Sequence, residues 1–469
     1  MRHLFLIAFI LITLTNCESQ ARQACALPYS NLQSEDRCGF VEVPRNWDIE
    51  TDETTSLGYL VIRSQSKNRK DDPVVFLQGG PGGNVLDLAN IYSQINLDSD
   101  RDFILYDQRG VGFSEELCPD LNLQLLEIMA LDLNIEEEIA ELKKRVQSCT
   151  DYLKTDPRQF STATNAKDLE ALRQHLGYKQ LNLFGGSYGT RLGLKYMELY
   201  PNHVRSAILS GLFPPEIRMY DHLFSSFSHS FNKMFSDCAK NSKCNTNYPN
   251  LKTEFLKFYS SLKAKPIQIF LNGTNFVLNQ QDILLFIHQM LYKDSTIEAL
   301  PKFILALKNR DKKYIAGTIN SFLPRLTLIN LAVYYSIMTA DEGRFNNQAK
   351  LNKDSRDLLF ADTGLSLFSA DPEVIKIWPS VNVESNPMQP VKSNIPTLLI
   401  SGEYDPVTPP SNGDTAAKRL RLGQHVIFSN DGHVPINTCF FSLAKQFLDN
   451  PKAELNGNCA RANTKFNWD

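Results

Sequence analysis

Short apolar runs recur along the chain between stretches with helical spacing, and this alternation is the dominant pattern of the sequence. Apolar runs with little polar alternation are typical of parallel strands that are buried on both faces. The runs span residues 74–77, 103–106, 181–184, 207–209, 397–400 and 425–428. Among the intervening helix candidates, residues 166–176 place Ala166, Leu169, Leu172 and Leu176 on one face. Strands alternating with helices predict an α/β fold with a mostly parallel, doubly wound sheet.

The alternation stops between residues 216 and 390. Helical patterns such as 281–292 and 297–308 fill this stretch, which is too long for a loop inside a compact domain. We therefore expect one α/β core, formed by residues 25–215 and 391–469, with a mainly helical cap at 216–390 inserted between two strands. A separate helical domain with its own role is the alternative. The charged run at 136–145 predicts a solvated helix with Glu-to-Lys/Arg pairs four residues apart.

The N-terminus has a secretory pattern. Basic residues at the start precede an apolar run at 4–14, which is too short to span a bilayer. The sequence allows two processing sites. A lipobox would make Cys17 the lipidated N-terminus, although Asn16 is an unusual residue directly before the cysteine. Alternatively, a signal peptide at 1–21 would be cleaved after Ala21. No later segment is apolar for long enough to cross a membrane. We expect a secreted or periplasmic protein, either free or tethered as a lipoprotein through Cys17.

Composition and cysteine content fit an exported enzyme. The chain has 469 residues, 42% of them hydrophobic, and a net charge of -3, which is ordinary for a globular enzyme and gives no footprint for nucleic acid. Both processing sites remove Cys17 from nine cysteines, and the remaining eight favour disulfides in an oxidising compartment. Eight cysteines allow 105 connectivities. Neighbours along the chain predict the pairs Cys25–Cys38, Cys118–Cys149, Cys238–Cys244 and Cys439–Cys459.

Metal binding is not indicated by these cysteines. None of them has CxxC spacing, and histidine partners are absent nearby in the sequence. We therefore expect no metal site, and no motif calls for an organic cofactor.

The strongest chemical signal is the segment Gly185-Gly186-Ser187-Tyr188-Gly189. It follows a predicted strand and leads into a helical stretch at 191–199, which is the context of the G-x-S-x-G nucleophile elbow. The turn is so tight that side chains two positions before and after the serine would collide, which explains the glycines. Ser187 is the predicted nucleophile; a glycine-rich turn without chemistry is the alternative.

Late in the chain, one histidine and one aspartate are placed to complete a triad, because chain order with this elbow runs Ser, then Asp or Glu, then His. His433 follows the last predicted strand in a loop and is the predicted base, whereas His425 opens that strand and is predicted to be structural. Asp405 follows the preceding strand and is the predicted acid. Glu403 is the fallback, and Asp431 is too close in sequence to His433 to bond its ring comfortably.

Two backbone N–H groups are predicted to bind the oxyanion of a tetrahedral intermediate. Tyr188 supplies one, directly after the nucleophile, and the loop Gln78-Gly79-Gly80-Pro81-Gly82-Gly83 supplies the other, with Gly80 as the candidate donor. This loop lacks the Gly-Lys-Ser/Thr and G-x-G-x-x-G patterns of nucleotide-binding loops, so that function is disfavoured.

Four motifs stand out together: residues 79–82, Asp107-Gln108-Arg109-Gly110-Val111-Gly112-Phe113-Ser114, the elbow at 185–190, and Gly402-Glu403-Tyr404-Asp405-Pro406-Val407-Thr408-Pro409-Pro410. Together they resemble the α/β-hydrolase serine peptidases, and in particular the secreted tripeptidyl aminopeptidase and prolyl-aminopeptidase-like group. The resemblance covers most of the chain, including the cap and the late cysteine pair.

The resemblance implies a serine exopeptidase that acts on short peptides with a free N-terminus. It also implies that acidic cap residues bind the substrate ammonium group, with Glu342 as the candidate. Two departures bear on strict proline specificity: Gln78 stands where many prolyl aminopeptidases have histidine, and Val434-Pro435 follows His433.

Two other functions stay open on the sequence. A carboxylesterase or lipase uses the same acyl-transfer chemistry on small esters, and a non-catalytic binding protein could retain the fold. Epoxide hydrolases and dehalogenases are disfavoured because they carry Asp at the elbow. The sequence carries no pattern that predicts an oligomeric state.

Overall fold

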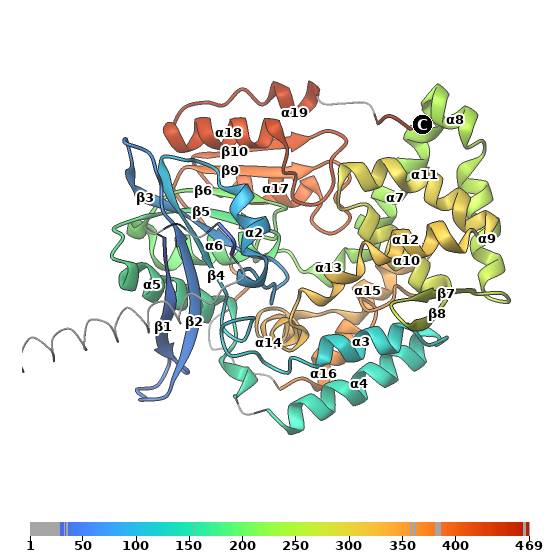
Figure 1. The fold of residues 1–469 in the computed structure, drawn as a ribbon, viewed down its shortest axis with the longest axis horizontal. Helices are drawn as coiled ribbons and strands as arrows, with labels where there is room; N and C mark the ends of the chain where they lie inside the picture. Colours follow the sequence, from blue (N-terminus) through green and yellow to red (C-terminus); the bar gives the residue numbers. More distant parts are fainter. Residues whose placement is uncertain are drawn as a thin grey trace, which may run out of the picture.

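An eight-stranded sheet forms the centre of the protein, seen in a computed structural model that describes residues 29–468 except 32, 34–35, 154, 357–358, 360–362, 380–385 and 463–465. The strand order is β1-β2-β4-β3-β5-β6-β9-β10, in which β1, β2 and β4 pair antiparallel and all other neighbours pair parallel (Figure 1). The strands are β1 Arg37–Pro44, β2 Thr54–Ile62, β3 Lys70–Leu77, β4 Arg101–Tyr106, β5 Leu181–Gly186, β6 Val204–Ser210, β9 Thr397–Gly402 and β10 Gly423–Phe428.

Helices cover both faces of the sheet, as a doubly wound fold requires. Helices α5 and α6 pack on one face and α18 and α19 on the other (Figure 1). Successive residues of β3 point to opposite faces, with Val74 and Phe76 in one apolar cluster and Val75 and Leu77 in the other. The helices around the sheet are α2 Ala89–Tyr92, α5 Thr162–Leu176, α6 Tyr188–Leu199, α17 Pro410–Ala417, α18 Thr438–Asp449 and α19 Asn458–Ala462.

The predicted fold class and its strands are confirmed. Each of the six apolar runs lies in a strand, from β3 to β10, and the helix predicted at 166–176 is the end of α5. The antiparallel strands β1 and β2 have no counterpart among the predictions.

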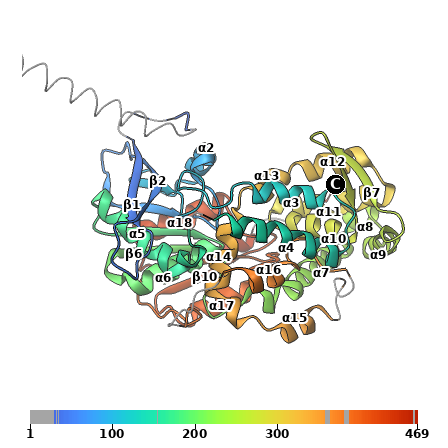
Figure 2. The ribbon, with the colours of Figure 1, turned by 90° about the horizontal axis from the view of Figure 1, so that it is seen from below.

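Between β6 and β9 the chain forms a second, mostly helical body that we call the cap. Figure 2 shows it beside the sheet rather than wrapped around it. Its elements are α7 Leu223–Lys240, α8 Ser242–Asn247, α9 Leu251–Leu262, β7 Ile267–Leu271, β8 Thr274–Leu278, α10 Gln280–Met290, α11 Asp294–Asn309, α12 Lys312–Asn320, α13 Leu323–Thr327, α14 Leu331–Asp341, α15 Gln348–Ser355 and α16 Asp371–Ile377. Short 3-10 helices are η1 Leu86–Leu88, η2 Ser93–Ile95, η3 Pro157–Gln159, η4 Pro201–His203, η5 Met219–Asp221 and η6 Gly343–Phe345.

Two helices from the first half of the chain pack against the cap: α3 (Leu121–Met129) and α4 (Ile135–Asp151). Met129 and Ala130 belong to the apolar cluster of the cap, and the buried Glu138 carboxylate accepts hydrogen bonds from the Ser366 hydroxyl and the Leu367 N–H. The predicted boundary placed these helices in the core and stays a prediction, because most of their buried apolar residues, such as Leu125 and Leu142, belong to the cluster that also contains the sheet.

Disulfides link neighbouring cysteines in the described part of the chain. The bonds Cys118–Cys149, Cys238–Cys244 and Cys439–Cys459 are present, each between predicted partners. Cys38 is also disulfide-bonded, whereas Cys25, Cys17 and the rest of the predicted signal segment lie outside the described residues.

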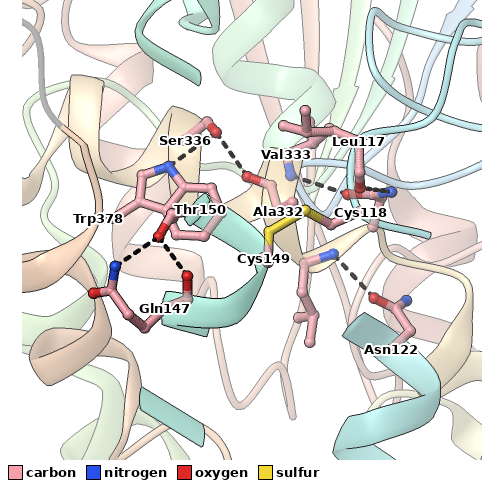
Figure 3. The surroundings of a disulfide bond; sticks show 12 residues. Leu117, Cys118, Asn122, Gln147, Cys149, Thr150, Ala332, Val333, Ser336 and Trp378 are labelled. Atoms are coloured by element: carbon pink, nitrogen blue, oxygen red, sulfur yellow. Dashed lines mark hydrogen bonds between the residues drawn. A yellow bond between two sulfur atoms is a disulfide. The ribbon is translucent and has the colours of Figure 1, made fainter. Parts of the chain in front are cut away.

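The first of these bonds joins the segment just before α3 to the last turn of α4, beside the cap helix α14 (Figure 3). There the Asn330 side chain donates to the Leu117 carbonyl at 2.7 Å, and the Leu331 N–H donates to the Asn122 side chain at 3.1 Å. The disulfide therefore stabilises the segment to which α14 is anchored.

Candidate active site

Ser187 sits on a sharp turn between β5 and α6. Its backbone has φ 56° and ψ −124°, a conformation that residues other than glycine rarely adopt. The Ser187 N–H donates to the Ser210 carbonyl at 2.9 Å. A Cβ at Gly185 would come within 2.5 Å of the Gly189 carbonyl oxygen, and a Cβ at Gly189 would collide with the Leu77 carbonyl oxygen. Only glycine fits at either position, so the elbow geometry follows directly from the motif.

His433 and Asp405 form a hydrogen-bonded pair at the carboxyl ends of β9 and β10. The His433 Nδ1 atom lies 2.7 Å from Asp405 Oδ2, which leaves Nε2 for another partner. The side chains are 6% and 0% exposed, so water competes little with this bond. The Thr408 hydroxyl contacts both, donating to Asp405 Oδ2 at 2.6 Å and lying 3.1 Å from His433 Nδ1.

The carboxylate of Asp405 stays ionised although it is fully buried. Burial raises its pKa, but the charge of His433 and hydrogen bonds from His433 and Thr408 outweigh that effect and hold the pKa below its usual value. The N–H groups of Val407 and Thr408 also donate to Asp405 Oδ1, both at 2.8 Å. An acceptor held this firmly fixes the orientation and tautomer of the imidazole ring.

Neighbouring residues bring this pair to the edge of the sheet that carries Ser187. A Cβ on Gly211, at the end of β6, would lie 3.1 Å from His433 Cε1. A Cβ on Gly186, which precedes Ser187, would lie 3.4 Å from Val434. The ends of β5, β6, β9 and β10 thus place Ser187 and the His–Asp pair at one edge.

The glycine-rich loop after β3 packs against the elbow. A Cβ on Gly79 would lie 2.9 Å from the Ser187 Cβ, so the loop can come this close to Ser187 only because residue 79 is a glycine. Gly80 has φ +115°, and Tyr188 is the first residue of α6, where a backbone N–H has no acceptor within the helix. The loop and the start of α6 therefore flank Ser187.

The Asp107–Ser114 motif supports this loop rather than the reaction. The Asp107 carboxylate accepts hydrogen bonds from the N–H groups of Val85 and Leu86, at 2.8 and 3.1 Å, and burial raises its pKa to about 6. The Gln108 side chain donates to the Gln78 carbonyl at 3.0 Å. The motif fixes the segment that contains Gly80.

Comparison with known proteins places this geometry in a family. Residues 72–437 match the family described as alpha/beta hydrolase fold. The chain belongs to this alpha/beta hydrolase family. The putative hydrolase YuaR of Escherichia coli (strain K12) is 23% identical over 426 residues, which cover 84% of this chain and 81% of that protein.

Two peptidases are also similar over part of this alpha/beta hydrolase. The serine protease Hip1 of Mycobacterium tuberculosis (strain ATCC 25618 / H37Rv) is 30% identical over 221 residues, 44% of this chain and 42% of that protein. The tripeptidyl aminopeptidase of Streptomyces coelicolor is 28% identical over 205 residues, 41% of this chain and 37% of that protein. The chain spans less than half the length of either peptidase in these alignments.

The other sequence candidates lie apart from the Ser–His–Asp cluster. The His425 ring is held between the Ser401 hydroxyl and the Asp414 carboxylate, both at 3.0 Å, a structural position in this hydrolase. The Glu403 carboxylate pairs with Lys233 at 3.0 Å. The Asp431 carboxylate accepts from the Asn437 side chain at 3.0 Å, and burial raises its pKa to about 6.

Glu342 is buried within the hydrolase, and the structure does not bring it together with the other candidates. Its carboxylate pairs with Arg191 at 2.7 Å and accepts the Met219 N–H at 3.1 Å, and the side chain is 0% exposed. A ligand for a substrate ammonium must be reachable, so this geometry does not favour the predicted role, which stays a prediction.

Three residues near the cluster escaped the sequence analysis: Thr408, Tyr292 and Arg325. Thr408 lies inside the quoted Gly402–Pro410 motif, which was a usable signal. The Tyr292 ring packs edge-on against His433, with ring centres 4.8 Å apart, and the Arg325 Cζ lies 3.8 Å from the centre of the Tyr292 ring. Both come from the cap and have no local pattern, so only the tertiary structure reveals them.

Proposed function

We propose that this hydrolase is a serine exopeptidase that releases N-terminal residues or short peptides from peptides with a free N-terminus. The observation that carries the proposal is the His433–Asp405 bond of 2.7 Å at the sheet edge that also holds Ser187 on its strained elbow. The two peptidase relatives support peptides as the substrate class.

In the proposed reaction, Ser187 Oγ attacks the scissile carbonyl carbon and gives its proton to His433 Nε2. The N–H groups of Gly80 and Tyr188 stabilise the oxyanion, and loss of one such donor typically costs about 10²–10³ in rate. The C–N bond then breaks as His433 protonates the leaving amine. Water repeats the sequence on the acyl-enzyme, which releases the acid and restores the serine, while Asp405 holds the ring orientation.

The setting proposed for this enzyme is outside the cytoplasm. Three described disulfides are compatible with an extracellular protein. Among the described residues, no helix is long and apolar enough to cross a membrane.

A substrate panel tests the proposal. Peptides of one to four residues with a chromogenic leaving group are offered with free and with acetylated N-termini, and Ser187→Ala is the control. We expect cleavage of the free peptides, at least tenfold slower cleavage of the acetylated ones, and no turnover by the variant. Cleavage of acyl esters alone would indicate a carboxylesterase and overturn the proposal.

A fluorophosphonate probe tests the nucleophile separately. We expect the probe to label the wild type and not Ser187→Ala. Undiminished labelling of that variant would contradict the assignment of Ser187.

A further inference from the structure

Arg325 is a cation on the cap that lies close to the candidate active site. Its guanidinium stacks on the Tyr292 ring, and that ring contacts His433. The two distances, 3.8 and 4.8 Å, limit the guanidinium carbon to less than about 9 Å from the centre of the His433 ring. An extended peptide spans that distance with about two to three residues. Groups near a scissile bond at Ser187 therefore come within reach of Arg325.

Backbone hydrogen bonds fix Arg325 beside the glycine-rich loop. The Asn84 N–H donates to the Leu328 carbonyl at 3.1 Å, and the Asn330 N–H donates to the Gly82 carbonyl at 2.8 Å. Arg325 lies in the short helix α13, directly before this junction. Its position relative to the oxyanion loop is thus set by the backbone rather than by a free side chain.

No anion neutralises this cation within the described part of the chain. The guanidinium makes no ion pair and no side-chain hydrogen bond there, and it stacks on the Tyr292 ring. Asp405 is the carboxylate that interacts electrostatically with Arg325, but it is already hydrogen-bonded to His433 and Thr408. A stacked guanidinium keeps its N–H donors at the rim of its plane, where they are free to bind a ligand.

The environment of Arg325 makes an unpaired charge costly. Burial lowers its pKa, yet an arginine remains charged at neutral pH. The side chain is only partly exposed, so it reaches solvent from a crowded position. A half-buried guanidinium without a counter-ion gains most from a planar anion such as a carboxylate, which it binds through two parallel hydrogen bonds.

We propose that Arg325 binds a carboxylate of the substrate, located within about two to three residues of the scissile bond. The inference rests on the proposed peptidase function and assigns part of its specificity. The carboxylate has two sources: the free C-terminus of a short peptide, or the side chain of an aspartate or glutamate.

Matched substrates and variants test this assignment. Each peptide is compared with its C-terminal amide, and each glutamate-containing peptide with its glutamine analogue. The variants are Arg325→Met, which keeps bulk and removes charge, and Arg325→Lys. Lys302→Met is the control, because Lys302 is also a cap cation over a tyrosine, with its Nζ 5.4 Å from the Tyr314 ring.

We expect Arg325→Met to lower kcat/KM by about 10- to 100-fold for carboxylate-bearing peptides, as for a lost hydrogen bond to a charged group. Neutral peptides change by less than about twofold, Arg325→Lys recovers part of the loss, and Lys302→Met matches the wild type. A loss confined to free acids identifies the C-terminal carboxylate, and a loss confined to glutamate peptides identifies a side chain. Equal loss for charged and neutral peptides, or no loss, overturns the proposal.

A binding measurement separates this inference from the proposed function. In the Ser187→Ala background, calorimetry compares a tripeptide acid with its amide, and a glutamate-containing tripeptide amide with its glutamine analogue, with and without Arg325→Met. We expect one carboxylate-bearing member to bind at least tenfold tighter than its partner, and Arg325→Met to abolish that difference. If the wild type cleaves no peptide, the peptidase proposal fails, and these affinities still decide the role of Arg325: equal affinities within both pairs refute it.

Discussion

Glu342 offers a test that separates a structural ion pair from a substrate-binding carboxylate. Its partner Arg191 is 3% exposed and Glu342 is 0% exposed, with 2.7 Å between Arg191 Nη1 and Glu342 Oε1. Burial raises the pKa of Glu342 even though Arg191 opposes the shift, which shows how costly its desolvation is. The substitution Glu342→Gln keeps the shape and removes the charge, leaving the buried Arg191 without its ion-pair partner.

The expected cost follows from what remains around Arg191. Removing one partner of a buried ion pair typically costs about 3–5 kcal/mol. Arg191 still donates to the carbonyls of Ile217 at 2.8 Å and Pro214 at 3.3 Å, and its Cζ lies 3.6 Å from the centre of the Phe213 ring. Because of these contacts we expect a loss of unfolding free energy near the lower end of that range, at about 3 kcal/mol. This is a large fraction of the roughly 5–15 kcal/mol that stabilises a typical protein.

Urea unfolding followed by tryptophan fluorescence measures the loss, and peptide hydrolysis measures KM in parallel. We expect Glu342→Gln to lower the unfolding free energy while KM for free peptides stays within about twofold. Glu373→Gln, which breaks an exposed pair with Lys376, is the control and should cost at most about 1 kcal/mol. Unchanged stability together with a KM raised tenfold or more would refute the structural interpretation and restore Glu342 as the ammonium ligand.

Three further predictions concern stability. Asp371 accepts hydrogen bonds from three buried tyrosine hydroxyls, and burial raises its pKa to about 7. Between about pH 4 and pH 7 the native carboxyl keeps a proton that the unfolded chain loses, so stability falls as the pH rises. Asp371→Asn should remove up to about 4 kcal/mol of this pH dependence. Urea melts that show the same pH dependence for the variant and the wild type would contradict this prediction. Replacing Cys118 and Cys149 by serine should cost about 4 kcal/mol, because the bond closes a loop with a sequence separation of 31; an unchanged urea midpoint would count against this. Gly189→Ala should cost at least about 1–3 kcal/mol and abolish turnover, because the added Cβ collides with the end of β3. The control Gly317→Ala has open space around the added Cβ, so it should leave turnover unchanged and keep or raise the stability in urea melts.

The parts of the fold that the sequence predicted are those encoded locally. Strands β3, β4, β5, β6 and β9 are buried along most of their length on both faces, and the edge strand β10 is likewise apolar in sequence, so these strands stand out as runs. The elbow, Asp405 and His433 each follow such a strand, which makes their placement at one edge predictable from chain order alone.

The parts that escaped prediction depend on the environment in three dimensions. Strands β1 and β2 lie near the sheet edge and carry a weaker apolar pattern. The hairpin β7–β8 turns at Asn272-Gly273, both with positive φ, and this Asn-Gly pair was a local signal that went unused. The ion pair of Glu342 and the stacking of Arg325 on Tyr292 join segments distant in sequence, which no local pattern encodes.

The junction between residues 79–84 and 328–330 has a consequence for how activity arises during folding. The turn that carries Ser187 is formed by residues close in sequence, but the glycine-rich loop beside it is held by residues 328–330 of the cap. Contacts between such distant segments carry a high loop-closure cost and form late. We therefore expect the chain to gain hydrolytic competence only once the cap has docked, so that a partly folded molecule with an open, unselective serine does not accumulate as an active species.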